Sequence, residues 1–154
     1  MIDKDSSGVT IPPPIVYFVC ILIGLGLNYF WSFSFFPQSI QGPIGYTIIA
    51  LSILLFGLIL REFSKSNTST DYRKSTATII SSGPFYYSRN PVYLSLTMLN
   101  IGIAFVVDSF WIIIMTIPAV LIIHYAVIIK EETYLIKKFG DEYRRYMSSV
   151  RRWI

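Results

Sequence analysis

Charged side chains are absent from two long stretches of this chain. No Asp, Glu, Lys or Arg stands between Ser6 and Leu60, and between Asn90 and Ile129 only Asp108 is charged. Hydrophobic residues make up 53% of the 154 residues and charged residues 14%, which excludes an ordinary soluble domain. Because about 20 helical residues cross a bilayer core, each stretch can hold two spans. The sequence therefore predicts a small all-α integral membrane protein.

Cysteine and histidine are also scarce, since Cys20 and His124 occur once each. A lone cysteine excludes an internal disulfide, and the two residues together cannot supply the ligands of a zinc site, so no metal is predicted. Cys20 is expected to pack inside the first span. No stretch alternates like a barrel strand, and no basic stripe of the kind that binds nucleic acid is present.

Turn-forming residues interrupt both apolar stretches near their centres, at positions 37–43 and 108–109. We predict a single domain with four transmembrane helices, over residues 14–36, 44–60, 92–107 and 110–129, a middle loop at 61–91 and a tail at 130–154. In the tail, apolar residues up to Phe139 fall on one side of a helix. A C-terminal interfacial helix that ends at Gly140 is therefore predicted.

Gly24 and Gly26 lie inside the first predicted span, and Gly57 lies inside the second. Small residues let helix backbones approach one another in a membrane. We interpret these glycines as packing sites.

The basic residues indicate the orientation in the membrane. One of the thirteen is Lys4, five lie in the middle loop and seven follow the fourth span, so none lies in the two turns on the other side. By the positive-inside rule, both termini and the middle loop are predicted to be cytoplasmic. The net charge of +4 then reflects topology and contact with anionic headgroups.

The first polar motif runs from Gly83 into the third span. Asn90 is predicted to cap this helix and Pro91 to be its first residue. The free N–H groups of the first turn, together with Arg89, favour an anion such as a carboxylate or phosphate. The alternative is that these residues only cap the helix and supply cytoplasmic charge.

The second polar motif is the acidic pair Glu131 and Glu132, which directly follows the fourth span. Desolvated carboxylates are costly, so the pair either forms a solvated helix face or binds ribose hydroxyls, an ammonium or a sulfonium cation. His124 precedes Glu131 by seven residues, which places the two on nearly the same helix face. His124 is therefore either a further residue of the site or a packing residue.

Together these motifs resemble the membrane-embedded methyltransferases that include isoprenylcysteine carboxyl methyltransferase and phospholipid methyltransferases. The matching residues are Gly83 to Phe85, Arg89 to Tyr93, Glu131-Glu132, Phe139 to Tyr143, Tyr146 and Val150 to Arg152. The resemblance implies S-adenosylmethionine as the methyl donor and Arg89 and Glu132 as catalytic residues. The cofactor-binding residues that it implies are Ala77, Thr78, Ile79, Ile80, Phe85, Asn90, Pro91, Val92, Tyr93 and Glu131.

The resemblance also implies a hydrophobic, lipid-like methyl acceptor among the membrane lipids, such as an isoprenylcysteine carboxylate or a lipid amine. In the isoprenylcysteine enzymes an arginine stands four residues before the first glutamate, where this chain has Val127, so the acceptor stays open. The alternative from another class is a non-catalytic assembly or transport protein with the same fold. A transport path needs polar groups inside the membrane, and the candidates are Asn28, Asn100 and His124.

Overall fold

The computed structural model describes residues 8–9, 11–34, 37–66 and 78–154, and every regular element in these ranges is helical. The elements are α1 Pro13–Phe30, α2 Gln38–Lys65, the 3₁₀ turn η1 Gly83–Tyr86, α3 Pro91–Val106, α4 Phe110–Ile123, the π-helical turn η2 His124–Ile128, α5 Ile129–Phe139 and α6 Asp141–Ser149. The predicted all-α fold class is confirmed.

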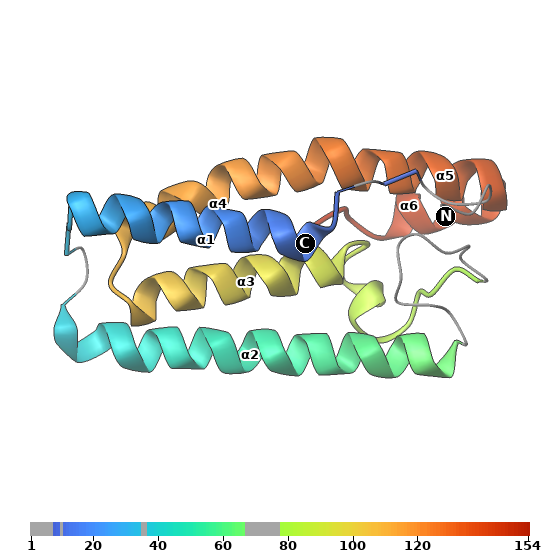
Figure 1. Ribbon diagram of the computed structural model, residues 1–154. Coiled ribbons are helices and arrows are strands. Elements are labelled where there is room, and N and C mark those ends of the chain that lie inside the picture. Colours follow the sequence, from blue (N-terminus) through green and yellow to red (C-terminus); the bar gives the residue numbers. More distant parts are fainter. Residues whose placement is uncertain (1–7, 10, 35–36, 67–77) are drawn as a thin grey trace.

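The four longest segments form an antiparallel bundle around α3 (Figure 1). α3 contacts α2 on one side and α1 and α4 on the other. α4 continues through η2 into α5, and α6 folds back against α5 at one end of the bundle. Residues from α1, α3, α4 and η2 share a core cluster near that end, which fixes the first turn of α3 relative to η2. Cys20 lies in this cluster, as predicted.

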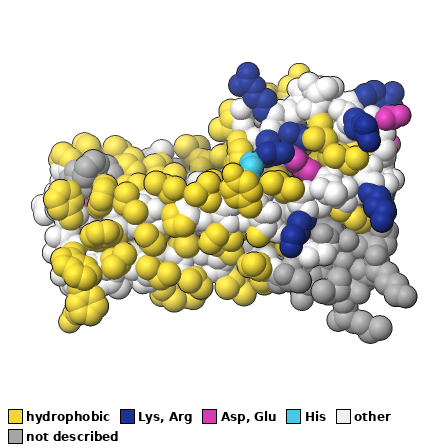
Figure 2. Space-filling model, turned by 90° about the horizontal axis from the view of Figure 1, so that it is seen from above, with side chains coloured by type: hydrophobic (Ala, Val, Ile, Leu, Met, Phe, Trp, Pro, Cys, Tyr) yellow, Lys and Arg dark blue, Asp and Glu magenta, His cyan; other side chains and the backbone are white. Residues whose placement is uncertain are grey.

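Three helices are long and apolar enough to cross a membrane: α1, α2 and the continuous helix Phe110–Phe139. α3 is apolar but shorter. Large apolar side chains on the outside of α1 and α2 are exposed, including Phe18, Leu22, Ile53 and Leu54. Figure 2 shows that hydrophobic side chains cover most of the visible length of the bundle, whereas charged side chains gather at one end. Such a continuous apolar surface is typical of contact with lipid.

Several helix ends differ from the predicted spans. The first helix ends at Phe30, before the predicted limit of Phe36. α2 starts at Gln38 and includes Pro43, because a proline near a helix start removes only one backbone hydrogen bond and its fixed φ suits the helix. The fourth helix continues to Phe139, ten residues past its predicted end, so the interfacial helix is a direct extension of it. The break at Gly140 is as predicted.

Glycine packing is only partly as predicted. A Cβ on Gly24 would lie 2.8 Å from the Cα of Ile112, so Gly24 does allow α1 and α4 to meet. The prediction is wrong for Gly26 and Gly57, where a Cβ would meet nothing within 4 Å. The closest approach of α2 and α3 instead involves Gly45 and Gly102. A Cβ on Gly45 would lie 3.0 Å from the carbonyl oxygen of Gly102.

Gly45→Ala tests this contact. The new methyl group would lie 2.9 Å from the backbone nitrogen of Val106, which cannot move without shifting α3. We expect the free energy of unfolding to fall by about 1 to 3 kcal/mol, as for overpacked cores. Gly57→Ala on the same helix is the matched control and should leave stability unchanged or raise it slightly. Thermal unfolding in detergent measures both, and equal melting temperatures would contradict the close contact.

Candidate functional site

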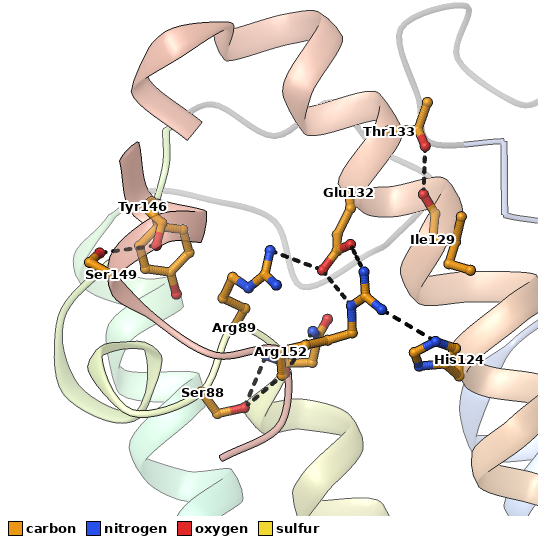
Figure 3. A network of polar contacts seen from close by, with 10 residues as sticks. Ser88, Arg89, His124, Ile129, Glu132, Thr133, Tyr146, Ser149 and Arg152 are labelled. Carbon is orange, nitrogen blue, oxygen red and sulfur yellow. Dashed lines mark hydrogen bonds and ion pairs between the residues drawn. The ribbon is translucent and has the colours of Figure 1, made fainter. Parts of the chain in front are cut away.

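The two polar motifs meet at the charged end of the bundle. The first turn of α3 supplies one side of the site, the junction of η2 and α5 supplies the other, and the tail after α6 lies between them (Figures 1 and 3). The hairpin of α3 and α4 makes this possible, because it returns the chain to the end from which α3 started.

Glu132 lies at the centre of the site and is 6% exposed. Nη1 of Arg89 lies 3.1 Å from one of its carboxylate oxygens. The guanidinium of Arg152 binds the carboxylate with both an Nε donor at 3.0 Å and an Nη2 donor at 2.6 Å. Figure 3 shows the two guanidinium groups on either side of the carboxylate. Two cations around one anion leave a net positive charge at this point.

The tail is tied to the first motif by backbone as well as side chains. The N–H of Arg89 donates to the carbonyl of Arg151 (3.0 Å), and the Asn90 side-chain amide donates to the carbonyl of Arg152 (3.0 Å). The hydroxyl of Ser88 also donates to the Arg152 carbonyl (3.4 Å). Trp153 packs against the core cluster. The segment from Arg151 to Trp153 is therefore a fixed part of the site.

Asn90 occupies the predicted N-cap position of α3, and Pro91 begins the helix as predicted. The prediction that the Asn90 side chain caps the helix is wrong: its oxygen accepts no capping hydrogen bond from α3, and its NH2 group donates to the tail. Leu94 donates the first intrahelical bond of α3, to the carbonyl of Asn90 (3.2 Å). The N–H of Val92 thus precedes that bond and has no acceptor within the helix.

Glu131 faces α3 and is bound by Tyr93. The Tyr93 hydroxyl lies 2.8 and 2.9 Å from the two carboxylate oxygens. Tyr93 itself is 7% exposed, and its carbonyl accepts bonds from the hydroxyls of Thr97 (2.8 Å) and Tyr17 (3.4 Å). The ring is held by the core cluster that surrounds it. Glu131 therefore has a fixed orientation and retains lone pairs for further hydrogen bonds.

The apolar residues that the resemblance assigns to cofactor binding lie near the charged end of the bundle. Ile79 packs against the cluster of Tyr143, Tyr146 and Val150, and Ile80 is buried. The Phe85 ring lies 5.6 Å from that of Phe63 on α2. Val92 packs on the core cluster, and Thr78 lies within the described residues. Ala77 lies outside the described residues.

Two tyrosines of α6 are neutral at the site. Burial, reinforced by the negative charge of Glu132, raises the pKa of Tyr143 to about 12. Burial likewise raises the pKa of Tyr146 above its usual range. Both hydroxyls therefore stay protonated at physiological pH. The Tyr146 hydroxyl donates to the carbonyl of Phe85 at 2.6 Å, which ties α6 to the first motif.

Sequence reasoning assigned no site role to Arg152 or Glu62. Arg152 belongs to the Val150 to Arg152 match, which is the signal that could have identified it. Glu62 was placed in the loop but lies on α2, where its carboxylate accepts from Ser82 (2.6 Å) and Lys65 (2.8 Å). A Cβ on Gly83, at φ +59, would lie 2.9 Å from the Glu62 side chain. Glu62 thus anchors the start of the first motif.

The donors and acceptors of the site suit a zwitterionic ligand with hydroxyl groups. The Nε of Arg89 is buried and forms no hydrogen bond with the described residues, which leaves a charged donor available. This donor and the N–H of Val92 in the first turn of α3 suit a carboxylate. Glu131 suits hydroxyl groups or a cation. The described residues include no group of three or more His, Cys, Asp or Glu that could hold a metal ion.

Comparisons with known proteins agree with this chemistry. A sequence model described as phospholipid methyltransferase matches residues 40–142, more than half of the chain. An uncharacterized protein of Haemophilus influenzae is 60% identical over 35 residues, which cover 23% of this chain and 56% of that protein. The chain thus spans about half the length of the curated relative that it matches. No solved structure matches it.

Glu132→Gln tests the ion-pair network. The substitution leaves Arg89, whose side chain is 9% exposed, buried without its counter-charge. We expect the free energy of unfolding to fall by about 3 to 5 kcal/mol. Adding Arg89→Met should recover much of that loss, because it removes the unpaired charge. Glu142→Gln, at an exposed position on α6, is the control. Thermal unfolding of the wild type, both single variants at Glu132 and Arg89, the double variant and the control measures the coupling, and additive losses would contradict the network.

Proposed function

We propose, since this chain belongs to the phospholipid methyltransferase family, that it transfers a methyl group from S-adenosylmethionine to an acceptor that dissolves in the membrane. One observation carries this proposal. At the charged end of an apolar bundle, Arg89, Glu132 and Arg152 form a buried network beside the Tyr93–Glu131 pair. A polar cofactor from water and an apolar acceptor from the bilayer can both reach such a position.

The residues of the site suit the parts of this cofactor. S-adenosylmethionine supplies an activated methyl group on its sulfonium. Glu131, oriented by Tyr93, is suited to bind the ribose hydroxyls or a cationic group. Arg89 and the first turn of α3 are suited to the carboxylate. Thr78, Ile79, Ile80 and Phe85 would border the cofactor, as would Ala77.

The protein would accelerate transfer by aligning the two reactants and excluding water, which needs no covalent nucleophile. Both oxygens of Glu132 are already engaged by guanidinium groups. We therefore assign Glu132 a positioning role, in place of the catalytic role that the resemblance implies. Its buried negative charge holds Arg89 and Arg152 in place, and Arg89 would contact the cofactor.

Val127 supports an acceptor without a carboxylate. Val127 is fully buried in the core cluster beside Tyr93, so the position that carries an arginine in the isoprenylcysteine enzymes is here inside the apolar core. A carboxylate at this position would be desolvated without a partner. A lipid amine carries no carboxylate and needs no cationic partner at this position, and we propose it as the acceptor class.

The charges of the described residues support a cytoplasmic site. Every described Lys and Arg lies at the end of α2, near η1, or from Lys130 onward, and these segments share one end of the bundle. The positive-inside rule places that end in the cytoplasm. S-adenosylmethionine would then reach the site directly from the cytosol.

Calorimetric titration of S-adenosylhomocysteine into the detergent-purified protein tests the cofactor site. We expect saturable binding that weakens roughly tenfold or more on Glu131→Gln, because a hydrogen bond to a charged group is lost. Tyr93→Phe should weaken it by a smaller factor, since the Glu131 carboxyl group is retained but loses its orienting hydroxyl. Glu142→Gln is the control. No binding by folded wild-type protein would favour a non-catalytic membrane protein of the same fold.

A transfer assay tests the acceptor. With labelled S-adenosylmethionine and protein reconstituted into vesicles, we expect label in an aminophospholipid and none in an added prenylcysteine. Glu131→Gln should abolish most of the transfer, and protein-free vesicles give the background. Label in the prenylcysteine alone would contradict the argument from Val127 while leaving the cofactor site intact.

A further inference from the structure

The long helix from Phe110 to Phe139 contains one π-helical turn. This turn, η2, spans His124–Ile128, and the N–H of Ile129 donates to the carbonyl of His124, five residues earlier. α4 precedes it and α5 follows it without a break. A π-helical turn accommodates one more residue than an α-helical turn and is often found at functional sites.

The additional residue changes which side chains share a face. In an α-helix each residue rotates by about 100°, so residues seven apart nearly coincide while residues eight apart differ by about 80°. On that basis His124 would align with Glu131. The π-helical turn takes up one residue, so His124 aligns instead with Glu132, eight residues on. Glu131 is correspondingly turned toward Tyr93 on α3.

Arg152 shows the result of this alignment. Its Nη1 lies 3.3 Å from Nε2 of His124, while its Nε and Nη2 bind Glu132. Figure 3 shows the guanidinium bridging the two side chains. A guanidinium only donates hydrogen bonds, so His124 accepts through an unprotonated Nε2. All three parts of the Arg152 head group thus have an acceptor.

The turn itself is held firmly in the fold. Val127 and Ile128 are fully buried in the core cluster, so the rotation of η2 is fixed by packing on α1 and α3. Tyr125, by contrast, is 66% exposed. Its ring packs edge-on against that of His124, with the two ring centroids 4.9 Å apart. The exposed residue is therefore the one whose removal disturbs the packing least.

We propose that His124 is a positioning residue of the cofactor site and that the π-helical turn sets the register that lets it act. His124 holds Arg152 against Glu132, and Glu132 in turn holds Arg89, which is the residue that would contact the cofactor. This inference rests on the proposed function. It adds a residue that touches neither cofactor nor acceptor.

Two substitutions test the contact. His124→Ala removes the acceptor, and we expect binding of S-adenosylhomocysteine to weaken roughly threefold to tenfold, which is less than for a direct hydrogen bond to a charged group because His124 acts on the cofactor only through Arg152. His124→Gln retains an acceptor oxygen at similar reach and should restore most of the affinity. Tyr125→Phe is the control in the same turn. KM for S-adenosylmethionine should rise in His124→Ala more than kcat falls, because an orienting contact in the binding site is lost.

A deletion tests the register. Removing Tyr125 lets the turn become α-helical, after which His124 and Glu132 are seven residues apart and still share a face. We expect this variant to fold and to bind S-adenosylhomocysteine within a few-fold of wild type. Deleting Ile117, an exposed residue of α4, instead rotates the part of the helix before this position relative to the part after it. This variant should not bind S-adenosylhomocysteine.

Calorimetry and thermal unfolding of all variants decide the outcome. Wild-type binding is the reference, so its absence would refute the proposed function rather than this inference. Full affinity in His124→Ala, or equal losses in His124→Ala and His124→Gln, would overturn the role of His124. Loss of folding or of binding on deletion of Tyr125 would overturn the role of the turn.

Discussion

The polar end of this protein depends on one buried carboxylate. Glu132 is desolvated, and the cost of burying it is offset only because Arg89 and Arg152 approach it from opposite sides. Those two arginines come from the start of α3 and from the tail, so a single anion joins three parts of the chain that are far apart in sequence. The rest of the site is arranged around this point.

Hydrophobic burial positions these charges. The core cluster beneath the site joins α1, α3, α4 and η2, and it fixes both Tyr93 and the rotation of η2. The glycine contact between α2 and α3 brings in the helix that carries Glu62, which anchors Gly83. Apolar packing therefore places the helices so that the polar side chains can form their hydrogen bonds. The polar network then determines which chemical groups the site can bind.

The sequence was sufficient for the all-α fold class, because uncharged stretches of this length leave few alternatives. It also suggested Arg89, Glu131 and Glu132 as candidates, since charged residues beside an apolar span are conspicuous, and the structure brings these three residues to one end of the bundle. It could not show that the Asn90 amide binds the tail, because that partner is 62 residues away. Nor could it show the π-helical turn, whose residues have no distinctive pattern, and so it paired His124 with Glu131.

The place of Arg152 in the chain has a consequence for biosynthesis. The helices α1 to α4 are made before the tail, and each can enter the membrane as it leaves the ribosome. Arg89 belongs to this earlier part of the chain, but Glu132 on α5 and the tail residues that complete their surroundings are translated later. A nascent chain can therefore be fully inserted in the bilayer and still lack a finished site, so maturation of the site is a separate step from membrane integration.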